Sequence, residues 1–271
     1  MRASEGDGAY ASAPFLMRFV TYDRGGQRRL GAIFEGEVVD LPDAVGHPAF
    51  PTTLEGLVTS SRGTVLDAAQ TALGRDDVLE WRIKRPRILT PLFPSSLLSP
   101  GSLDVDRRVI GPEQDVPWPD GAAWLEYEPK VAAVLGLETS RDDPFEPQRH
   151  LFGYTLVNDW QARDASGAPV TAAEGVPIAI GPCVVTADEV DPQVMYLQVR
   201  IDGEEVAKGN LNGTASSLAA SIEAASRLGP LARGDALALN PFSSREWQLW
   251  PGAKVDLGAE GIGTLTNTLA R

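Results

Sequence analysis

The chain has 271 residues, 43% hydrophobic and 23% charged, which is enough for one large domain, or a large one and a small one, of a soluble globular protein. Its formal net charge of −13 argues against nucleic-acid binding, because phosphate contacts need clustered Lys and Arg, and it disfavours binding to anionic membrane surfaces. No apolar stretch approaches the roughly 18 residues that a membrane-spanning helix needs.

The N-terminal segment lacks the apolar core of a secretory signal, and we expect residues 1–16 to be a disordered leader of a cytoplasmic protein. The single cysteine, Cys183, agrees with that compartment because a disulfide framework needs cysteines in pairs. Within the run Gly-Pro-Cys-Val-Val, Cys183 is predicted to be a small buried hydrophobic residue and not a nucleophile.

A small β-rich unit follows the leader. Residues 18–22, 30–34 and 36–41 have the composition of strands, with a turn at Gly25-Gly26 between the first two. Pro42 favours the start of a short helix, and the apolar periodicity before Gly74 predicts an amphipathic helix over residues 64–73. Residues 83–124 are rich in proline and lack periodicity, which predicts loops.

The segment from Trp124 to Gly136 alternates in polarity before it becomes apolar. Glu126 and Glu128 occupy every second position, and Lys130 is the next residue in that period. On a β-strand these three side chains point to one face. Three charges that lead into a buried run indicate a functional site, although an exposed strand end with an ordinary ion pair would give the same pattern.

A second segment, residues 151–164 (LFGYTLVNDWQARD), places Asn158-Asp159 and Arg163-Asp164 at the end of a β-branched and aromatic run. Together the two segments resemble the fumarylacetoacetate hydrolase superfamily, whose members have a Glu-x-Glu strand that ends at a glycine and then a GYT-x-x-ND-x-x-ARD segment. The resemblance covers the chain from about residue 85 to the C-terminus.

The resemblance implies a mixed α/β, mainly β fold. A β-sandwich roll would form the catalytic domain, residues 85–271, and a small αβ domain, residues 17–84, would precede it as a scaffold. The resemblance also implies a small-molecule substrate and a homodimer. Strands over 196–201 and 205–207, joined by the type I′ turn signal Asp202-Gly203, and a helix over 214–228 complete the prediction.

The residues at the metal site depart from the family pattern. Family members hold Mg²⁺, Mn²⁺ or Ca²⁺ with the two glutamates and the aspartate of the ND pair. Counted back from Gly136, the glutamate positions fall on Glu128 and Lys130, and the aspartate falls on Asp159. An ammonium cannot ligate a cation and repels it. Either the ligands are Glu126, Glu128 and Asp159, which would hold Mg²⁺ or Mn²⁺, or no metal cofactor binds.

A second departure indicates what would replace the metal. Family members carry a lysine ahead of the next strand, where this chain has Glu174. The family's Glu and Lys therefore correspond to Lys130 and Glu174, which is a reciprocal exchange of charge. Our hypothesis is that the Lys130 ammonium occupies the cation site between Glu128, Asp159 and Glu174. A plain structural salt bridge is the alternative.

The proton-shuttle motif of the family is missing. In members, a mobile loop carries a His and a Glu that act as an acid–base pair, and the corresponding residues 97–111 contain no histidine. His47 and His150 lie elsewhere in the chain. The shuttle is therefore absent unless an acidic residue replaces it, and the candidates are Asp104, Asp106 and Glu113.

The substrate-binding turn is altered as well. Where family members have a glycine-threonine turn that approaches the substrate carboxylate, this chain has residues 240–247. This stretch either binds an anion or a carbonyl or forms a plain loop, and its polar candidates are Asn240, Ser243, Ser244 and Arg245. The resemblance adds Tyr154 and Asp164 to the predicted substrate-binding residues. Trp160, Trp247 and Trp250 either line an aromatic pocket or pack in the core.

Three functions remain open. The first is a divergent enzyme that acts on a small 1,3-dicarbonyl or 2-oxo acid through an enol or enolate, by C–C hydrolysis, decarboxylation, hydration or tautomerisation. Lys130 or Arg163 would stabilise the enolate, and Glu128, Asp159 or Glu174 would be the base. The second is a metal-dependent C–C bond hydrolase. The third is a catalytically silent relative that binds a ligand. A composition rich in Ala, Arg, Gly and Pro hints at specialised metabolism.

Overall fold

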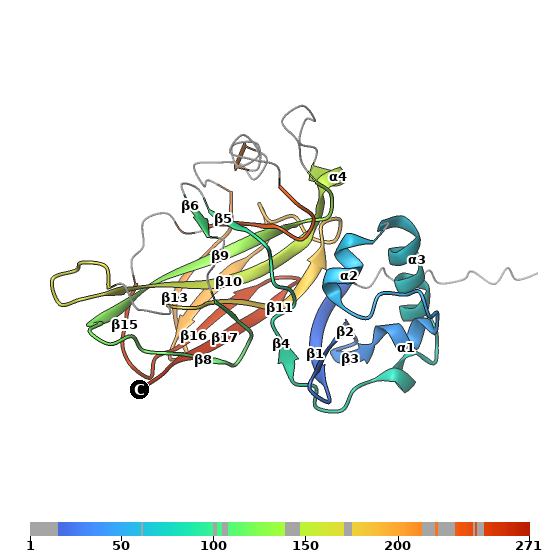
Figure 1. Cartoon of the computed structure of the whole chain (residues 1–271), viewed down its shortest axis with the longest axis horizontal. Coiled ribbons are helices and arrows are strands. Elements are labelled where there is room, and N and C mark those ends of the chain that lie inside the picture. Colours follow the sequence, from blue (N-terminus) through green and yellow to red (C-terminus); the bar gives the residue numbers. More distant parts are fainter. Residues whose placement is uncertain are drawn as a thin grey trace, which may run out of the picture.

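The computed structural model describes residues 16–60, 62–99, 102–104, 108–138, 147–170, 175–212, 220–221, 231–240, 242 and 247–271. In these residues two β-sheets pack face to face, and a helical N-terminal unit lies at one end of the molecule (Figure 1). The predicted leader, except for Leu16, lies outside the described residues, as does most of the helix predicted over 214–228. No helix in the described part is long and apolar enough to cross a bilayer.

The N-terminal unit is an antiparallel sheet segment with helices packed against it (Figure 1). The chain turns at Gly25 and Gly26, which both have positive φ, so the predicted turn is confirmed. Phe19, Leu30 and Leu73 are among the buried side chains of its core. The elements are β1 (Arg18–Arg24), β2 (Gln27–Phe34), β3 (Glu37–Asp40), α1 (Leu41–Val45), α2 (Leu54–Thr59), α3 (Arg62–Leu73) and the 3₁₀ helix η1 (Val78–Trp81).

β1 also pairs with β11, so the strands of the two predicted domains form one continuous sheet. The strand order of this sheet is β3-β2-β1-β11-β10-β9-β14-β5-β6. Three further strands pair outside this order: β4 with β1, β7 with β11, and β15 with β9. The elements that the later part of the chain adds to this sheet, with one helix, are β4 (Ile88–Leu89), β5 (Leu97–Ser99), β6 (Ser102–Asp104), β7 (Val109–Ile110), β9 (Trp124–Leu135), α4 (Pro147–His150), β10 (Leu151–Arg163), β11 (Ile178–Thr186), β14 (Ala236–Leu239) and β15 (Trp247–Leu249).

The smaller sheet is made almost entirely by the C-terminal third of the chain. Its order is β13-β12-β16-β17-β8. Asp202 and Gly203, between β12 and β13, both have positive φ, as the predicted type I′ turn requires. The elements are β8 (Asp115–Val116), β12 (Leu197–Ile201), β13 (Glu204–Gly209), β16 (Lys254–Ala259) and β17 (Gly263–Leu269).

The proline-rich segment 83–124 is more ordered than the sequence predicted. It contributes β4 to β8, each only two or three residues long. Such short strands leave no periodicity in the sequence, and they form because a neighbouring strand offers backbone partners. The prediction of loops was therefore wrong at these positions.

The main core lies between the two sheets and confirms the predicted β-sandwich. Trp160 from the larger sheet and Leu257 from the smaller one belong to the same buried cluster. Cys183 is also part of it and is fully buried, and burial raises the pKa of its thiol to about 12. Cys183 is therefore a core residue, as predicted. The alternate side chains of the smaller sheet point outward and are polar, which is typical of an antiparallel sheet with one face in water.

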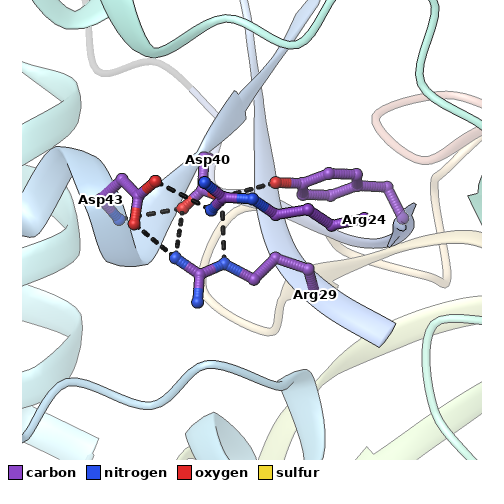
Figure 2. A network of polar contacts seen from close by, with 5 residues as sticks. Arg24, Arg29, Asp40 and Asp43 are labelled. Carbon is purple, nitrogen blue, oxygen red and sulfur yellow. Dashed lines mark hydrogen bonds and ion pairs between the residues drawn. The ribbon is translucent and has the colours of Figure 1, made fainter. Parts of the chain in front are cut away.

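A charged network ties the N-terminal strands to α1 (Figure 2). The Asp40 carboxylate is buried, and it accepts hydrogen bonds from the Tyr22 hydroxyl at 2.5 Å, from Arg24 at 2.6 Å and from Arg29 at 3.0 Å. It also caps α1 by accepting from the backbone N–H of Asp43 at 2.9 Å. Burial acts to raise the pKa of Asp40, but the hydrogen bonds from Arg29 and Tyr22 outweigh it and hold the pKa below its ordinary value.

We expect Asp40→Asn to destabilise the protein by about 3 kcal/mol, because it removes the buried charge that Tyr22, Arg24 and Arg29 share and leaves only the partly exposed Asp43 to pair with both guanidiniums. Chemical denaturation at pH 7 measures this loss. Since the folded pKa of Asp40 is depressed, its contribution is present above the unfolded value of about 3.9 and disappears as pH falls through the folded pKa. Asp77→Asn is the control, because Asp77 forms an exposed pair with Arg75 and should change stability little. Equal effects of both variants would contradict the prediction.

Candidate functional site

The predicted charges lie on β9 and β10, which pair antiparallel over most of their length. Lys130 is opposite Val157, Glu128 is opposite Asp159, and Glu126 is opposite Gln161. Residues that are directly opposite each other share a face of the sheet. The register therefore gathers charged side chains from both strands on one face, which we call the site face: Glu126, Glu128, Lys130, Asp159 and Arg163.

The ammonium of Lys130 lies between two carboxylates. Its Nζ is 2.6 Å from Asp159 Oδ2 and 3.1 Å from Glu128 Oε2. The side chains of Lys130 and Asp159 are 8% and 5% exposed, whereas that of Glu128 is 31% exposed. Burial acts to lower the pKa of Lys130, but the charges of Asp159 and Glu128 outweigh it and raise the pKa above its ordinary value. Lys130 is therefore a permanent cation at neutral pH and not a base.

Arg163 and Glu126 form a second ion pair on the site face. Arg163 Nε donates to Glu126 Oε2 at 2.7 Å, and an Nη atom of the same guanidinium is 2.6 Å from that oxygen. Arg163 also donates to Gln161 at 3.0 Å. The Glu126 carboxylate is therefore neutralised by Arg163, while Glu128 and Asp159 share Lys130.

Asn158 points to the opposite face and holds the two sheets together. Its Oδ1 accepts from the Tyr127 hydroxyl at 2.6 Å, and its Nδ2 donates to Asn267 Oδ1 at 3.0 Å. Asn267 in turn donates to the carbonyl oxygens of Gly111 and Gln114 at 3.1 and 2.9 Å. Alternation along β10 thus divides the Asn158-Asp159 pair between a structural role and the site. Sequence reasoning missed Tyr127 and Asn267, for which the strand alternation offered the only signal.

The partner strands of β9 change at the site. β14 pairs with residues 131–134 of β9, and β15 pairs with residues 125–127. Within these described strands, residues 128–130 of β9 therefore pair with neither β14 nor β15. Pro129, which has no N–H to donate to a neighbour, is placed in this interval. β14 ends at Leu239, and Asn240 is the first residue of the connection between β14 and β15.

These side chains do not fit a divalent cation. The position between Glu128 and Asp159 that a metal would use contains the Lys130 ammonium, and the Glu126 carboxylate is engaged by Arg163. A divalent ion about 4 Å from that ammonium would be repelled by roughly 8 kcal/mol at an effective dielectric constant of about 20. Within the described ranges, no group of three or more His, Cys, Asp or Glu side chains is arranged to hold a metal ion.

Two predicted substrate-binding residues, Tyr154 and Asp164, have no contact with Lys130 and its carboxylates in the hydrogen bonds and ion pairs of the described residues. Tyr154 belongs to the core between the sheets, and burial together with the nearby charge of Asp191 raises its pKa to about 12. Asp164 accepts from the backbone N–H groups of Ser166 and Ala168, so it stabilises the turn that follows β10. The structure does not bring either residue to the Lys130 cluster. Their roles in substrate binding stay predictions.

The remaining predicted residues are scattered or not described. Glu113 is exposed, at positive φ, and its backbone N–H donates to the Thr266 carbonyl oxygen. Trp160 is buried in the core and Trp250 is half exposed. His150 is buried, whereas His47 is exposed. Asp104 lies in β6. The residues outside the described part of the chain are Asp106, Glu174, Ser243, Ser244 and Arg245.

Comparison with known proteins identifies the family. The model of the fumarylacetoacetate (FAA) hydrolase C-terminal domain matches residues 77–270. "Oxaloacetate tautomerase YisK" of Bacillus subtilis is 29% identical over 156 residues, which are 54% of this chain and 52% of that protein. The chain therefore spans about half the length of this curated relative.

Solved structures agree on the fold. The fumarylacetoacetate hydrolase of Exiguobacterium antarcticum superposes with a TM-score of 0.73 at 23% identity, over 94% of this chain and 100% of that one. Maleylpyruvate hydrolase of Sphingobium sp. SYK-6, solved with manganese(II) and pyruvate, superposes with a TM-score of 0.73 at 19% identity, over 94% and 99% of the two chains. Because the family model covers most of the chain, the protein belongs to the fumarylacetoacetate hydrolase family, whose named members here include a hydrolase and a tautomerase.

Proposed function

We propose that this protein is a metal-independent enzyme that processes a small 2-oxo acid or 1,3-dicarbonyl compound through an enol or enolate. The observation that carries this proposal is the buried Lys130 ammonium, in contact with Glu128 and Asp159 on a face shared with Arg163. Chemistry of this kind needs a fixed positive charge near the carbonyl oxygen that becomes negative in the transition state. Here a side chain of the protein would supply that charge.

Glu128 is the best candidate for the base. Its carboxylate is the more exposed of the two that contact Lys130, so it is the one that a substrate can reach. When Glu128 takes the proton from the carbon next to the carbonyl, its own negative charge disappears and a negative charge forms on the substrate oxygen. The Glu128 carboxylate oxygen and the substrate oxygen would both lie beside the Lys130 ammonium. The negative charge would therefore remain next to this cation as it moves from Glu128 to the substrate. Asp159, which is more deeply buried, would keep Lys130 in place.

Among the reactions that the family resemblance allows, we propose keto–enol tautomerisation. This reaction needs one group that removes a proton and returns it at another atom, and it needs no activated water. Cleavage of a C–C bond by water needs a further base, and residues 97–111 contain no histidine for that role. The similarity to a protein named oxaloacetate tautomerase supports oxaloacetate as the first substrate to test.

An assay of oxaloacetate tautomerisation with and without EDTA tests the proposal. We expect turnover above the uncatalysed rate that EDTA does not reduce and added Mg²⁺ does not raise. Lys130→Met should lower kcat about 100-fold or more, since it removes the charge that stabilises the enolate. Turnover that requires Mg²⁺ or Mn²⁺ would contradict the metal-independent mechanism. Acylpyruvates in the same assay reveal C–C cleavage, and ligand binding without any turnover would indicate a catalytically silent relative.

The assembly and location of the protein stay predictions. The family resemblance implies a homodimer, and the cytoplasmic location is expected from the N-terminal composition and the single cysteine. Light scattering of the purified full chain would measure its mass in solution directly. A value equal to the 28.9 kDa chain would contradict the dimer.

A further inference from the structure

Asn240 directly follows β14, whose last residue pairs with the neighbour of Lys130 in β9. The last two pairs of this antiparallel ladder are Ala238 with Ala132 and Leu239 with Val131. The ladder ends there, so Asn240 is the residue that follows the partner of Val131, and a ladder longer by one pair would set it opposite Lys130. Alternation gives the face: Ala238 packs with Ala132 in a cluster on the site face, whereas Leu239 packs between the sheets. By this alternation we expect the Asn240 side chain on the site face, near Lys130, and Asn240 is partly exposed.

The orientation of the Asn240 amide follows from one hydrogen bond. The backbone N–H of Phe242 donates to Asn240 Oδ1 at 2.9 Å. Because the amide nitrogen cannot accept this bond, the oxygen and the nitrogen are distinguished, and the Nδ2 group is the free end of the side chain. Phe242 is buried and its ring contacts Trp247 edge-on, with 6.1 Å between ring centroids. The turn that orients Asn240 is thus held by packing.

A directed hydrogen-bond donor is needed at this place. Two of the three N–H bonds of Lys130 are directed at Asp159 and Glu128, so Lys130 contributes charge more than a directed bond. In the described residues, no acceptor contacts Asn240 Nδ2, which has two N–H bonds to offer. We infer that Asn240 Nδ2 donates to the carbonyl oxygen of the substrate as it becomes an enolate oxygen, so that Asn240 is a catalytic residue. This inference rests on the proposed function.

The substitution Asn240→Asp separates this role from the turn. Asp keeps an acceptor for the Phe242 N–H, so the turn is retained, but it has no N–H to donate. We expect kcat to fall about 100-fold or more with Asn240→Asp and with Asn240→Ala, with a smaller change in KM and, for Asn240→Asp, an unchanged Tm. Gln248→Ala is the control, because Gln248 is exposed on the same face opposite Glu126 and is expected to keep wild-type activity.

Oxalate, a planar dianion that resembles the enolate of pyruvate, gives a readout that does not need turnover. Calorimetry should show oxalate binding to the wild-type protein and to Gln248→Ala, and at least tenfold weaker binding to Asn240→Ala. Wild-type kcat and oxalate affinity in both Asn240 variants would overturn this inference alone. A wild-type protein that neither binds oxalate nor turns over any dicarbonyl acid would overturn the proposed function, and this inference with it.

Discussion

Lys130→Glu is expected to create a binding site for a divalent cation, which the metal-independent mechanism that we propose does not use. The substitution places a third carboxylate beside those of Glu128 and Asp159, which now contact the ammonium at 3.1 and 2.6 Å. Carboxylate oxygens are ligands that suit Mn²⁺ and Mg²⁺, and three of them give a net negative site. Without metal the variant should be strongly destabilised, because three like charges share a largely buried place. Mn²⁺ at about 100 times its Kd would return roughly 2.7 kcal/mol of stability.

Thermal unfolding with and without Mn²⁺ measures this effect. Lys130→Gln tests whether the new carboxylate is needed, because it removes the ammonium without adding a charged ligand, and we expect no stabilisation by Mn²⁺. Lys254→Glu is the matched control for the charge change, since Lys254 is 53% exposed in the smaller sheet. Stabilisation of the wild-type protein by Mn²⁺ would show that a cation binds despite Lys130, and the proposed mechanism would fail.

The pH dependence of Lys130 gives a second check with the same proteins. Its pKa is raised in the folded state, so its contribution to stability is fully present below the unfolded value of about 10.4 and is lost as pH rises through the folded pKa. The difference in unfolding free energy between wild type and Lys130→Gln should therefore be constant from pH 7 to about 10 and should shrink above that pH. A difference that shrinks between pH 7 and 9 would place the pKa of Lys130 below its ordinary value and contradict the ion-pair geometry.

Asn158→Ala is expected to be the most destabilising change outside the site face. It removes the partner of both the Tyr127 hydroxyl and the Asn267 amide, and all three side chains are fully buried. Each unsatisfied buried group costs about 1–3 kcal/mol, and the cavity adds to this, so we expect a loss of about 4 kcal/mol. Denaturant unfolding measures the loss, and the exposed Asn212→Ala is the control.

A double-mutant cycle tests whether the network acts as a unit. Tyr127→Phe removes the hydroxyl that donates a hydrogen bond to Asn158. The loss of unfolding free energy caused by this substitution should be smaller on the Asn158→Ala background than in the wild-type protein. Burial raises the pKa of Tyr127 well above its ordinary value, so the hydroxyl remains a donor throughout the pH range in which the protein is stable. Additive effects of the two changes would mean that the contact between them contributes little to holding the sheets together.

The family resemblance and the two long strands of the site could be recognised from the sequence, because both depend on short motifs and on the alternation of polar and apolar residues. Alternation in Trp124–Lys130 placed Glu126, Glu128 and Lys130 on one face, and the ND-x-x-ARD segment placed Asp159 and Arg163 nearby. The short strands of segment 83–124 were missed, because two or three residues carry no periodicity and pair only where a neighbour already exists. Alternation could have placed Tyr127 on the opposite face of β9, but that this face packs against the smaller sheet is not visible in a local pattern.

Which charge meets which was decided by the tertiary structure alone. Period-2 alternation is a property of a single strand, so the order of residues within β9 is enough to put Lys130 on one face with two glutamates. The pairing of Lys130 with Asp159, and of Glu126 with Arg163, depends on the register between β9 and β10. The place of Asn240 depends on the register of β14. Register joins residues that are far apart in the chain and is selected by the burial of whole strand faces, which no short stretch of sequence contains.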